Sequence, residues 1–157
     1  MTYEPAKIED LQAVYNVVQN TIKNVYPRYY PMEVVNYFCM IHSENAIAND
    51  IKNGCVSVLK TDGIIVGTGS FSDNHITRVY VLEEEHKKGF GTFIMKKLEE
   101  QIKKQYDKAY LDTSLPASSF YEKLGYSTVR HEKQAVENRK VLMYEVMEKN
   151  LLKNEAL

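Results

Sequence analysis

Apolar residues in the first third of the chain recur with the three-and-four spacing of amphipathic helices. The clearest run extends from Leu11 to Val25, and Glu9 and Asp10 just ahead of it suit a helix N-terminus, where the helix dipole favours negative charge. A rigid, proline-containing turn interrupts the pattern before it resumes. The helices predicted in this part span residues 11–25, 32–43 and 46–52.

After Gly54 the pattern changes to short runs that are typical of strands. Thr61-Asp62-Gly63 predicts the turn of a hairpin, and a polar turn at residues 72–74 separates the next two strands. The strands are predicted at residues 3–6, around 56–58, and at 64–71, 75–82, 109–113, 127–132 and 140–147.

Two more helices are predicted between the later strands. The first carries a buried stripe of Ile94, Met95, Leu98, Ile102 and Tyr106, with charged residues on its outer side. The second covers residues 117–124 and ends at a glycine, the usual residue of a left-handed C-terminal cap. The order of elements predicts a mixed α/β (α+β) fold with one sheet and helices on its faces. We expect one domain over residues 1–149 and a tail at 150–157, with a frayed helix from residue 148.

Composition narrows the class of protein. The chain has 157 residues and a formal net charge of −1, so nothing favours binding to nucleic acid or to a membrane. Cys39 and Cys55 lie far apart and outside any metal-binding spacing, so we interpret both as packing residues and expect no metal. The polar N-terminus is unlike a signal peptide, so we expect a cytoplasmic protein. We also expect the protein to be a monomer or a homodimer.

The candidate chemistry lies in a glycine turn between a predicted strand and a predicted helix. Glycines let a backbone approach a ligand closely, and the free amides of a helix N-terminus attract phosphate. The same Gly-x-Gly could instead only turn the chain. It is too short for a Walker loop and lacks the third glycine of a dinucleotide fingerprint. The turn consists of His86, Lys87, Lys88, Gly89, Phe90, Gly91 and Thr92.

Here the sequence resembles the GNAT superfamily of N-acetyltransferases, which places [Gln/Arg]-x-x-Gly-x-[Gly/Ala] after its fourth strand. His86-x-x-Gly89-x-Gly91 is similar to that motif, with a histidine in place of Gln or Arg. A second motif, Asn-x-x-Ala-x-x-Phe-Tyr-x-x-x-Gly-[Phe/Tyr], is similar to residues 114–126, with Ser114 in place of Asn. The two motifs occur in the family's order and spacing.

The resemblance implies the GNAT fold: one mixed, mostly antiparallel, twisted sheet of about six to seven strands with about four helices. It also implies acetyl-CoA as co-substrate, held by the glycine turn and by the backbone of the preceding strand. The residues implied to bind it are Val79, Tyr80, Val81, His86, Lys87, Lys88, Gly89, Phe90, Gly91, Thr92, Ser114, Ala117 and Tyr121.

Two side chains are candidates for proton transfer. Tyr121 occupies the family's position for the acid that protonates the CoA sulfur, although it could be a core tyrosine. His75 lies fourteen positions before Gly89, where some members carry a glutamate that acts as general base. It could instead be a polar residue at the start of a strand. Strict alternation would put His75 on the same face as Val79 and Val81. The N–H of Val81 is implied as the donor to the oxyanion.

The acceptor is predicted only as a class. Tyr26, Arg28, Tyr29 and Tyr30 form an aromatic turn that could line an amine pocket by cation–π contact or brace two helices. We expect a small-molecule amine or a peptide amine as the acceptor. The alternative is a non-catalytic acyl-CoA-binding sensor or interaction module of the same fold. Arg78 is expected on the opposite strand face as a surface or salt-bridging residue, and His42 has no identifiable partner.

Overall fold

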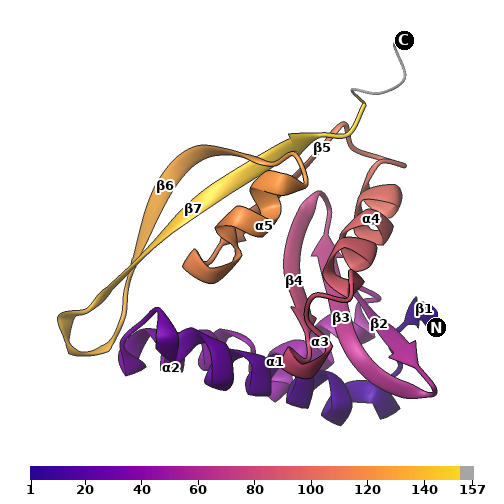
Figure 1. Cartoon of the computed structure of the whole chain (residues 1–157), viewed down its shortest axis with the longest axis horizontal. Helices are drawn as coiled ribbons and strands as arrows, with labels where there is room; N and C mark the ends of the chain where they lie inside the picture. Colours follow the sequence, from indigo (N-terminus) through magenta and orange to yellow (C-terminus); the bar gives the residue numbers. More distant parts are fainter. Residues whose placement is uncertain (153–157) are drawn as a thin grey trace.

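A computed structural model of the chain describes residues 1–152 and contains one seven-stranded sheet in the order β1-β2-β3-β4-β5-β7-β6 (Figure 1). All neighbouring strands are antiparallel except β4 and β5, which are parallel. The strands are β1 (Thr2–Pro5), β2 (Val56–Thr61), β3 (Ile64–Ser72), β4 (His75–Val81), β5 (Lys108–Thr113), β6 (Ser127–Ala135) and β7 (Val141–Asn150).

Helices cover both faces of the sheet. In the described residues they are α1 (Leu11–Val25), α2 (Met32–Ile41), α3 (Glu44–Lys52), α4 (Phe90–Ile102) and α5 (Ser118–Lys123). The first three pack on one face and share a core with β2 and β4, in which Val18, Ile47 and Val58 are fully buried. α4 and α5 pack on the other face, where Ile94, Leu98 and Met147 belong to a second core. The predicted mixed fold is therefore confirmed.

The two strands in the middle of the sheet separate from each other. β4 and β5 pair only at His75–Tyr110 and Ile76–Leu111, so the rest of β4 has no strand neighbour on that side within residues 1–152. The register between β3 and β4 shifts by one residue next to this point, because Ser70 faces Arg78 while Phe71 faces Ile76. Thr77 is therefore the extra residue of a β-bulge, which bends a strand and increases its twist. The bulge and the parting of β4 from β5 open the centre of the sheet.

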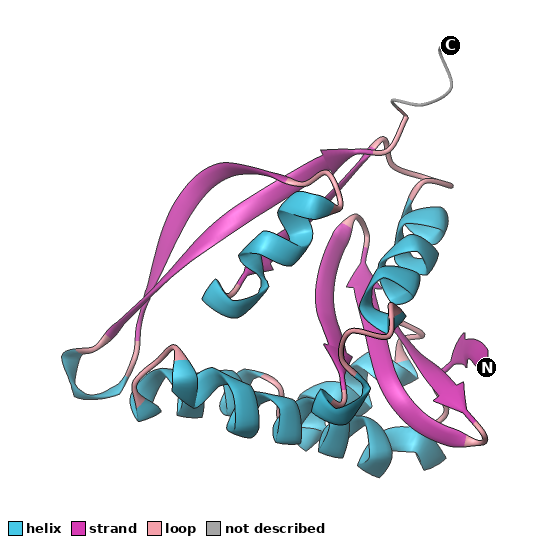
Figure 2. Cartoon of the chain, viewed as in Figure 1, coloured by secondary structure: helices cyan, strands magenta, loops and turns pink. Residues whose placement is uncertain are grey.

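The C-terminal hairpin extends away from the rest of the sheet, as Figure 2 shows. Its tip returns to the N-terminal half, where Asn138 Nδ2 donates to Glu33 Oε1 of α2 at 3.2 Å. β7 continues as a strand through Asn150, paired with Lys108. The frayed helix predicted from residue 148 is therefore wrong for residues 148–150, because pairing with β5 keeps the chain extended. The rest of the predicted tail, residues 153–157, lies outside the described residues. No helix among residues 1–152 is long and apolar enough to cross a bilayer.

Candidate active site

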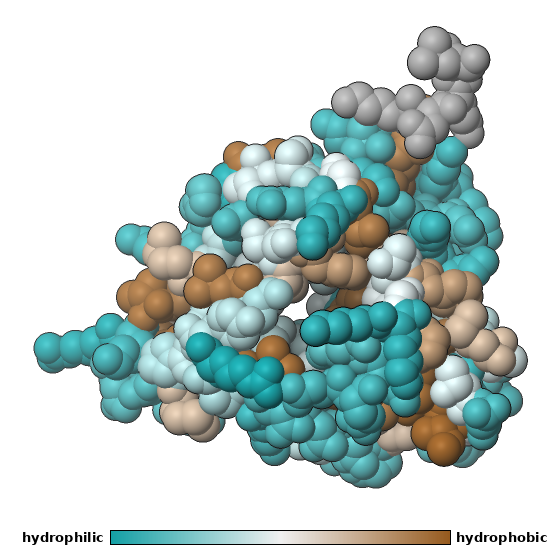
Figure 3. Space-filling model, in the orientation of Figure 1, coloured by the Kyte–Doolittle hydropathy of each residue, from teal (hydrophilic) through white to brown (hydrophobic). Residues whose placement is uncertain are grey.

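A cavity of about 490 Å³ lies where β4 and β5 separate. Figure 3 shows this face of the molecule hollowed between the part that carries α5 and the part that carries α1. The cavity is bounded by β4, the C-terminal part of α1, the N-terminus of α4 and the segment around α5. Its lining residues are Thr21, Val25, Tyr26, Val79, Tyr80, Val81, Glu85, His86, Lys87, Gly89, Phe90, Gly91, Thr92, Ser114, Pro116, Ala117, Phe120 and Tyr121.

The structure brings together nearly all the residues that the sequence indicated for binding a cofactor. Each of them lines this cavity except Lys88, whose Nζ pairs with Glu85 Oε2 at 2.7 Å. Two segments about 30 residues apart in sequence, the glycine turn and the start of α5, form adjoining walls. The two walls pack closely against each other at Gly91 and Phe120. A Cβ atom added to Gly91 would lie only 3.2 Å from Phe120 Cζ.

The glycine turn has the geometry of an anion-binding loop. Gly89 is the N-cap of α4 with φ +83°, and Lys87 has φ +64°. The first helical hydrogen bond runs from the Phe93 N–H to the Gly89 carbonyl at 3.0 Å. The amides of residues 90–92 precede that bond and so have no acceptor within the helix. These amides lie at the positive end of the α4 dipole, where they can bind phosphate oxygens.

The open edge of β4 supplies further backbone donors. Leu82 N–H donates to Val66 O at 2.9 Å, so the pair Leu82–Val66 is hydrogen-bonded across β3 and β4. In an antiparallel ladder hydrogen-bonded and non-hydrogen-bonded pairs alternate, so the amides of Val79 and Val81 point away from β3. They face the opening between β4 and β5, where an extended ligand can pair with them as a strand would.

His86 takes a different role from the glutamine or arginine of the family motif. Its Nε2 lies 2.8 Å from the Val81 carbonyl oxygen, so this nitrogen carries the proton and donates it. Thr21 Oγ1 of α1 reaches the same oxygen at 3.3 Å. Both contacts fix the end of β4 relative to α1 and the glycine turn. Because both involve the Val81 carbonyl oxygen, the Val81 N–H stays available to a ligand.

Three buried tyrosines line the cavity in addition to the residues of the glycine turn. Tyr26, Tyr80 and Tyr121 are all 8% exposed, and the hydroxyls of Tyr26 and Tyr80 lie 3.3 Å apart. Burial raises the pKa of each phenol above its usual value near 10. All three are therefore protonated at neutral pH, and Tyr121 can act as a proton donor within the cavity.

The structure does not bring His75 into this cavity. The bulge at Thr77 interrupts the alternation on which the shared face with Val79 and Val81 was predicted, so that prediction is wrong. The His75 ring instead stacks on Tyr110, with centroids 4.4 Å apart, and its Nε2 lies 3.3 Å from Asp112 Oδ2. Along a strand the four steps from His75 to Val79 cover at most about 13 Å, so His75 lies well away from the amides that face the cavity.

Arg78 and His42 are partners in a buried polar cluster. Arg78 was predicted as a surface or salt-bridging residue: it is only 6% exposed, so it is not on the surface, and it forms an ion pair with Asp50 of α3. Its Nε donates to Nδ1 of His42 at 3.0 Å. Burial, together with the Arg78 charge, lowers the pKa of His42 to about 3, so the imidazole is neutral. This cluster joins α2, α3 and β4 behind the bulge.

Of the four residues in the aromatic turn, only Tyr26 lines the cavity. Arg28 pairs with Glu83 at 2.6 Å, and Tyr29 is 52% exposed. Tyr30 packs against Phe38 with ring centroids 5.7 Å apart, and its hydroxyl accepts from the Leu115 N–H at 2.6 Å. Tyr30 therefore braces the turn against α2, whereas Tyr26 both packs against α2 and lines the cavity.

Several lining residues were not predicted as site residues. Thr21 and Val25 lie within the amphipathic run predicted at residues 11–25 and had no role assigned, although a threonine in an apolar stripe is a signal for a specific contact. Phe120 was part of the quoted motif but had no assigned role. The others are Glu85 and Pro116.

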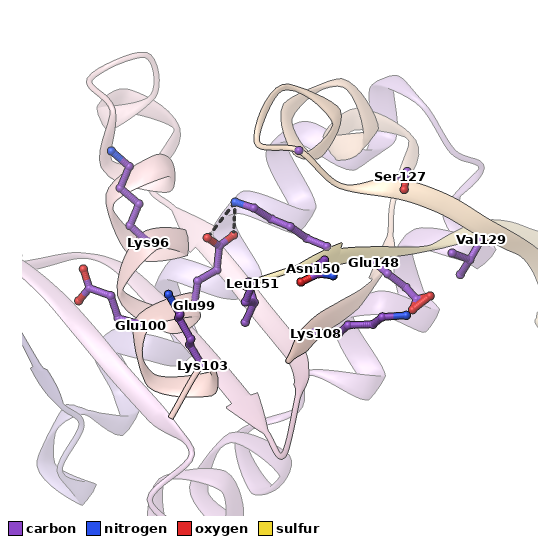
Figure 4. Close-up of a pocket in the computed structure, with 12 residues that line it drawn as sticks. Lys96, Glu99, Glu100, Lys103, Lys108, Ser127, Val129, Glu148, Asn150 and Leu151 are labelled. Carbon is purple, nitrogen blue, oxygen red and sulfur yellow. Dashed lines mark hydrogen bonds and ion pairs between the residues drawn. The ribbon is translucent and has the colours of Figure 1, made fainter. Parts of the chain in front are cut away.

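A second cavity, of about 640 Å³, lies between α4, the end of β7 and the start of β6 (Figure 4). Its walls carry positively charged lysines and negatively charged glutamates. Lys149 Nζ donates to both carboxylate oxygens of Glu99, at 3.1 and 2.9 Å. None of the residues predicted for binding or catalysis lines it. The first cavity is therefore the candidate active site, although the second is larger.

Comparisons with known proteins agree with this assignment. The family model described as "Acetyltransferase (GNAT) domain" matches residues 25–148. A solved GCN5-related N-acetyltransferase from Rhodopseudomonas palustris superposes with a TM-score of 0.86 at 20% identity, covering 95% of this chain and 94% of that chain. PaiA N-acetyltransferase from Thermoplasma acidophilum in complex with coenzyme A gives a TM-score of 0.73 at 22% identity, covering 96% and 99%. No curated protein matches the chain by sequence.

Proposed function

The chain belongs to the GNAT family of acetyl-CoA-dependent N-acetyltransferases, and from this premise we propose that it transfers acetyl directly from acetyl-CoA to a primary amine in a ternary complex. The observation that carries the proposal is the single cavity in which the glycine turn, the open edge of β4 and Tyr121 meet. The acceptor that we propose is a small-molecule amine or a peptide amine.

The cavity fits the chemical groups of acetyl-CoA. The amides of Phe90, Gly91 and Thr92 would hold the pyrophosphate, and Lys87 lies beside them with its mobile positive charge. The amide of Val81, next to the glycine turn, would pair with the extended, amide-containing pantetheine arm as a neighbouring strand would. Ala117 and Phe120 supply apolar wall on the opposite side.

Acetyl-CoA supplies an acetyl group activated as a thioester. We propose that the amide of Val79, further along β4 from the glycine turn, donates a hydrogen bond to the carbonyl oxygen as negative charge develops there, which stabilises the transition state electrostatically. The Val81 N–H, the donor that the resemblance implied, would be engaged by the pantetheine arm. The neutral amine would attack the thioester carbon, the C–S bond would break, and Tyr121 would give its proton to the departing sulfur, because its buried phenol keeps that proton at neutral pH. The proton lost by the attacking nitrogen would restore the Tyr121 phenol. His75 has no place in this proposal, since it lies outside the cavity and is engaged with Tyr110 and Asp112.

A pair of glycine variants tests the donor site. Gly89→Asp puts a carboxylate where phosphate would bind, and we expect acetyl-CoA affinity to fall by about a hundredfold or more, measured by isothermal titration calorimetry. Gly63→Asp is the matched control: Gly63 also has a positive φ, +79°, with open space around it, but it lies in the β2–β3 turn. Both variants carry the same backbone strain, so only the site differs.

Equal acetyl-CoA affinity in folded Gly89→Asp and Gly63→Asp would disprove the phosphate site. The non-catalytic alternative makes a different prediction. A sensor would show the same loss of acetyl-CoA binding in Gly89→Asp, but the wild-type protein would release no CoA with any amine.

A further inference from the structure

Tyr26 lines the cavity from the α1–α3 face of the sheet, whereas the glycine turn begins α4 on the opposite face. Tyr26 begins the short 3₁₀ turn η2 (Tyr26–Arg28) that follows α1, and it is 8% exposed. The ring of Phe38 meets it edge-on from α2, with centroids 4.9 Å apart. Tyr30 lies on it as well, with centroids 6.0 Å apart. These aromatic contacts hold the Tyr26 ring from the side away from the cavity.

The hydroxyl of Tyr26 bridges the two separated strands. It lies 3.3 Å from the Tyr80 hydroxyl on β4, and it also interacts with the side chain of Ser114, directly after β5. The neighbouring Tyr30 hydroxyl binds the Leu115 N–H of the same loop at 2.6 Å. Tyr26 thus spans the opening between β4 and β5, and the loop that it reaches is fixed by a second tyrosine.

We propose that Tyr26 is the residue that restricts the acyl donor to acetyl and excludes longer acyl groups. The inference rests on the proposed function, in which pyrophosphate lies at the glycine turn and the acyl group lies at the other end of the cavity. A longer acyl chain has to extend further from the glycine turn, towards Tyr26 and its hydrogen-bonded neighbours. Making room for it would break the contacts to Tyr80 and Ser114 and leave buried hydroxyls without partners, which is unfavourable.

The wall is too well packed to yield at low cost. The Tyr26 ring is held by Phe38 and Tyr30, and its hydroxyl is held from both strands. A close-packed site discriminates against an added methylene by roughly tenfold or more when it cannot expand. We therefore expect the wild-type protein to bind butyryl-CoA, which has two additional methylenes, at least about tenfold more weakly than acetyl-CoA.

The test measures binding of free CoA, acetyl-CoA and butyryl-CoA by isothermal titration calorimetry, so it needs no knowledge of the acceptor. Tyr26→Val shortens the wall, and we expect it to bind butyryl-CoA at least as tightly as acetyl-CoA. Tyr29→Val is the matched control in the same turn, because Tyr29 is exposed and lies outside the cavity. It should keep the wild-type preference for acetyl-CoA.

Two results would overturn the inference. One is a folded Tyr26→Val protein whose preference between the two donors equals that of wild type. The other needs no variant: wild type that binds butyryl-CoA as tightly as acetyl-CoA has no such wall, and this decides the question if Tyr26→Val does not fold. Failure of the proposed function is detected separately: without a donor site free CoA would not bind at all, and without transfer no amine would cause release of CoA from acetyl-CoA.

Discussion

Tyr121 and His42 show how burial changes what a titratable side chain can do. Burial raises the pKa of Tyr121, which keeps its proton and makes it a donor at neutral pH. Burial lowers the pKa of His42 to about 3, so this imidazole stays neutral far below its usual range. The first residue lines the cavity and the second lies behind β4, so we expect one to affect catalysis and the other to affect stability.

Tyr121→Phe should lower turnover with acetyl-CoA and an accepted amine by roughly a hundredfold, because the variant cannot protonate the leaving sulfur. Acetyl-CoA affinity should change little, since the ring that packs against Phe120 and Tyr126 remains. Turnover and calorimetric affinity are measured on the same protein. Tyr106→Phe is the control, because the Tyr106 hydroxyl binds Asp73 outside the cavity. Equal turnover in both variants would contradict the acid role of Tyr121.

His42→Gln should make stability less sensitive to acid. At pH 7 the imidazole is neutral in the folded and unfolded chain, so it causes no penalty. As the pH falls below about 6.5, the unfolded chain takes up a proton that the folded chain refuses until about pH 3. This uptake lowers the free energy of unfolding at pH 5 by about 2 kcal/mol relative to neutral pH, since each pH unit below about 6.5 is worth about 1.36 kcal/mol.

Urea denaturation of wild type and His42→Gln at pH 7.5 and pH 5 measures this effect. Glutamine can still accept from Arg78 Nε with its side-chain oxygen, so the variant keeps the hydrogen bond but lacks the titration. We expect wild type to lose about 2 kcal/mol more than the variant between the two pH values. Parallel losses in the two proteins would show that His42 is not held neutral by the fold.

At the scale of elements, β4 is the strand on which the site depends, and the sequence predicted its existence better than its geometry. The run from His75 to Leu82 correctly predicts a strand, because its alternating apolar residues fit a half-buried sheet. The bulge at Thr77 depends on pairing with β3, which a local pattern cannot reveal. This one extra residue explains why the predicted face of His75 was wrong, while the amides of Val79 and Val81 still meet the cavity.

The buried Arg78 cluster should stabilise the bulged form of β4. Arg78→Met removes the ion pair to Asp50 and the donor to His42, and we expect a loss of about 2 kcal/mol in the free energy of unfolding. The estimate is reduced because the Asp50 side chain is 35% exposed and can regain water. A looser β4 should also bind acetyl-CoA more weakly, which calorimetry would detect.

A double-mutant cycle with Asp50→Asn isolates the pair from the general effect of losing a buried side chain. Because Asp50→Asn removes the unpaired carboxylate, the double variant should be destabilised by about 1 kcal/mol less than the sum of the single variants. Strict additivity in urea denaturation would mean that Arg78 and Asp50 do not stabilise each other.

For the whole molecule, the resemblance of two short motifs predicted the family and most of the cavity. Each motif is a continuous stretch of sequence, so the residues within it lie close together whatever the packing of the rest of the chain. The contacts that sequence did not predict join distant segments: Arg28 with Glu83, Tyr30 with Leu115, and His42 with Arg78. Those pairs depend on how α1 and α2 pack across the sheet, and no single-chain pattern records that packing.

Release of CoA thiol measures whether this cavity transfers acetyl to an amine. Purified protein is incubated with acetyl-CoA and a panel of small-molecule and peptide amines, with Gly89→Asp in parallel to report background hydrolysis. We expect thiol release that depends on an amine, produces an equimolar acetylated amine and falls to background in Gly89→Asp. Thiol release by wild type that is independent of every amine, or that persists unchanged in Gly89→Asp, would contradict it.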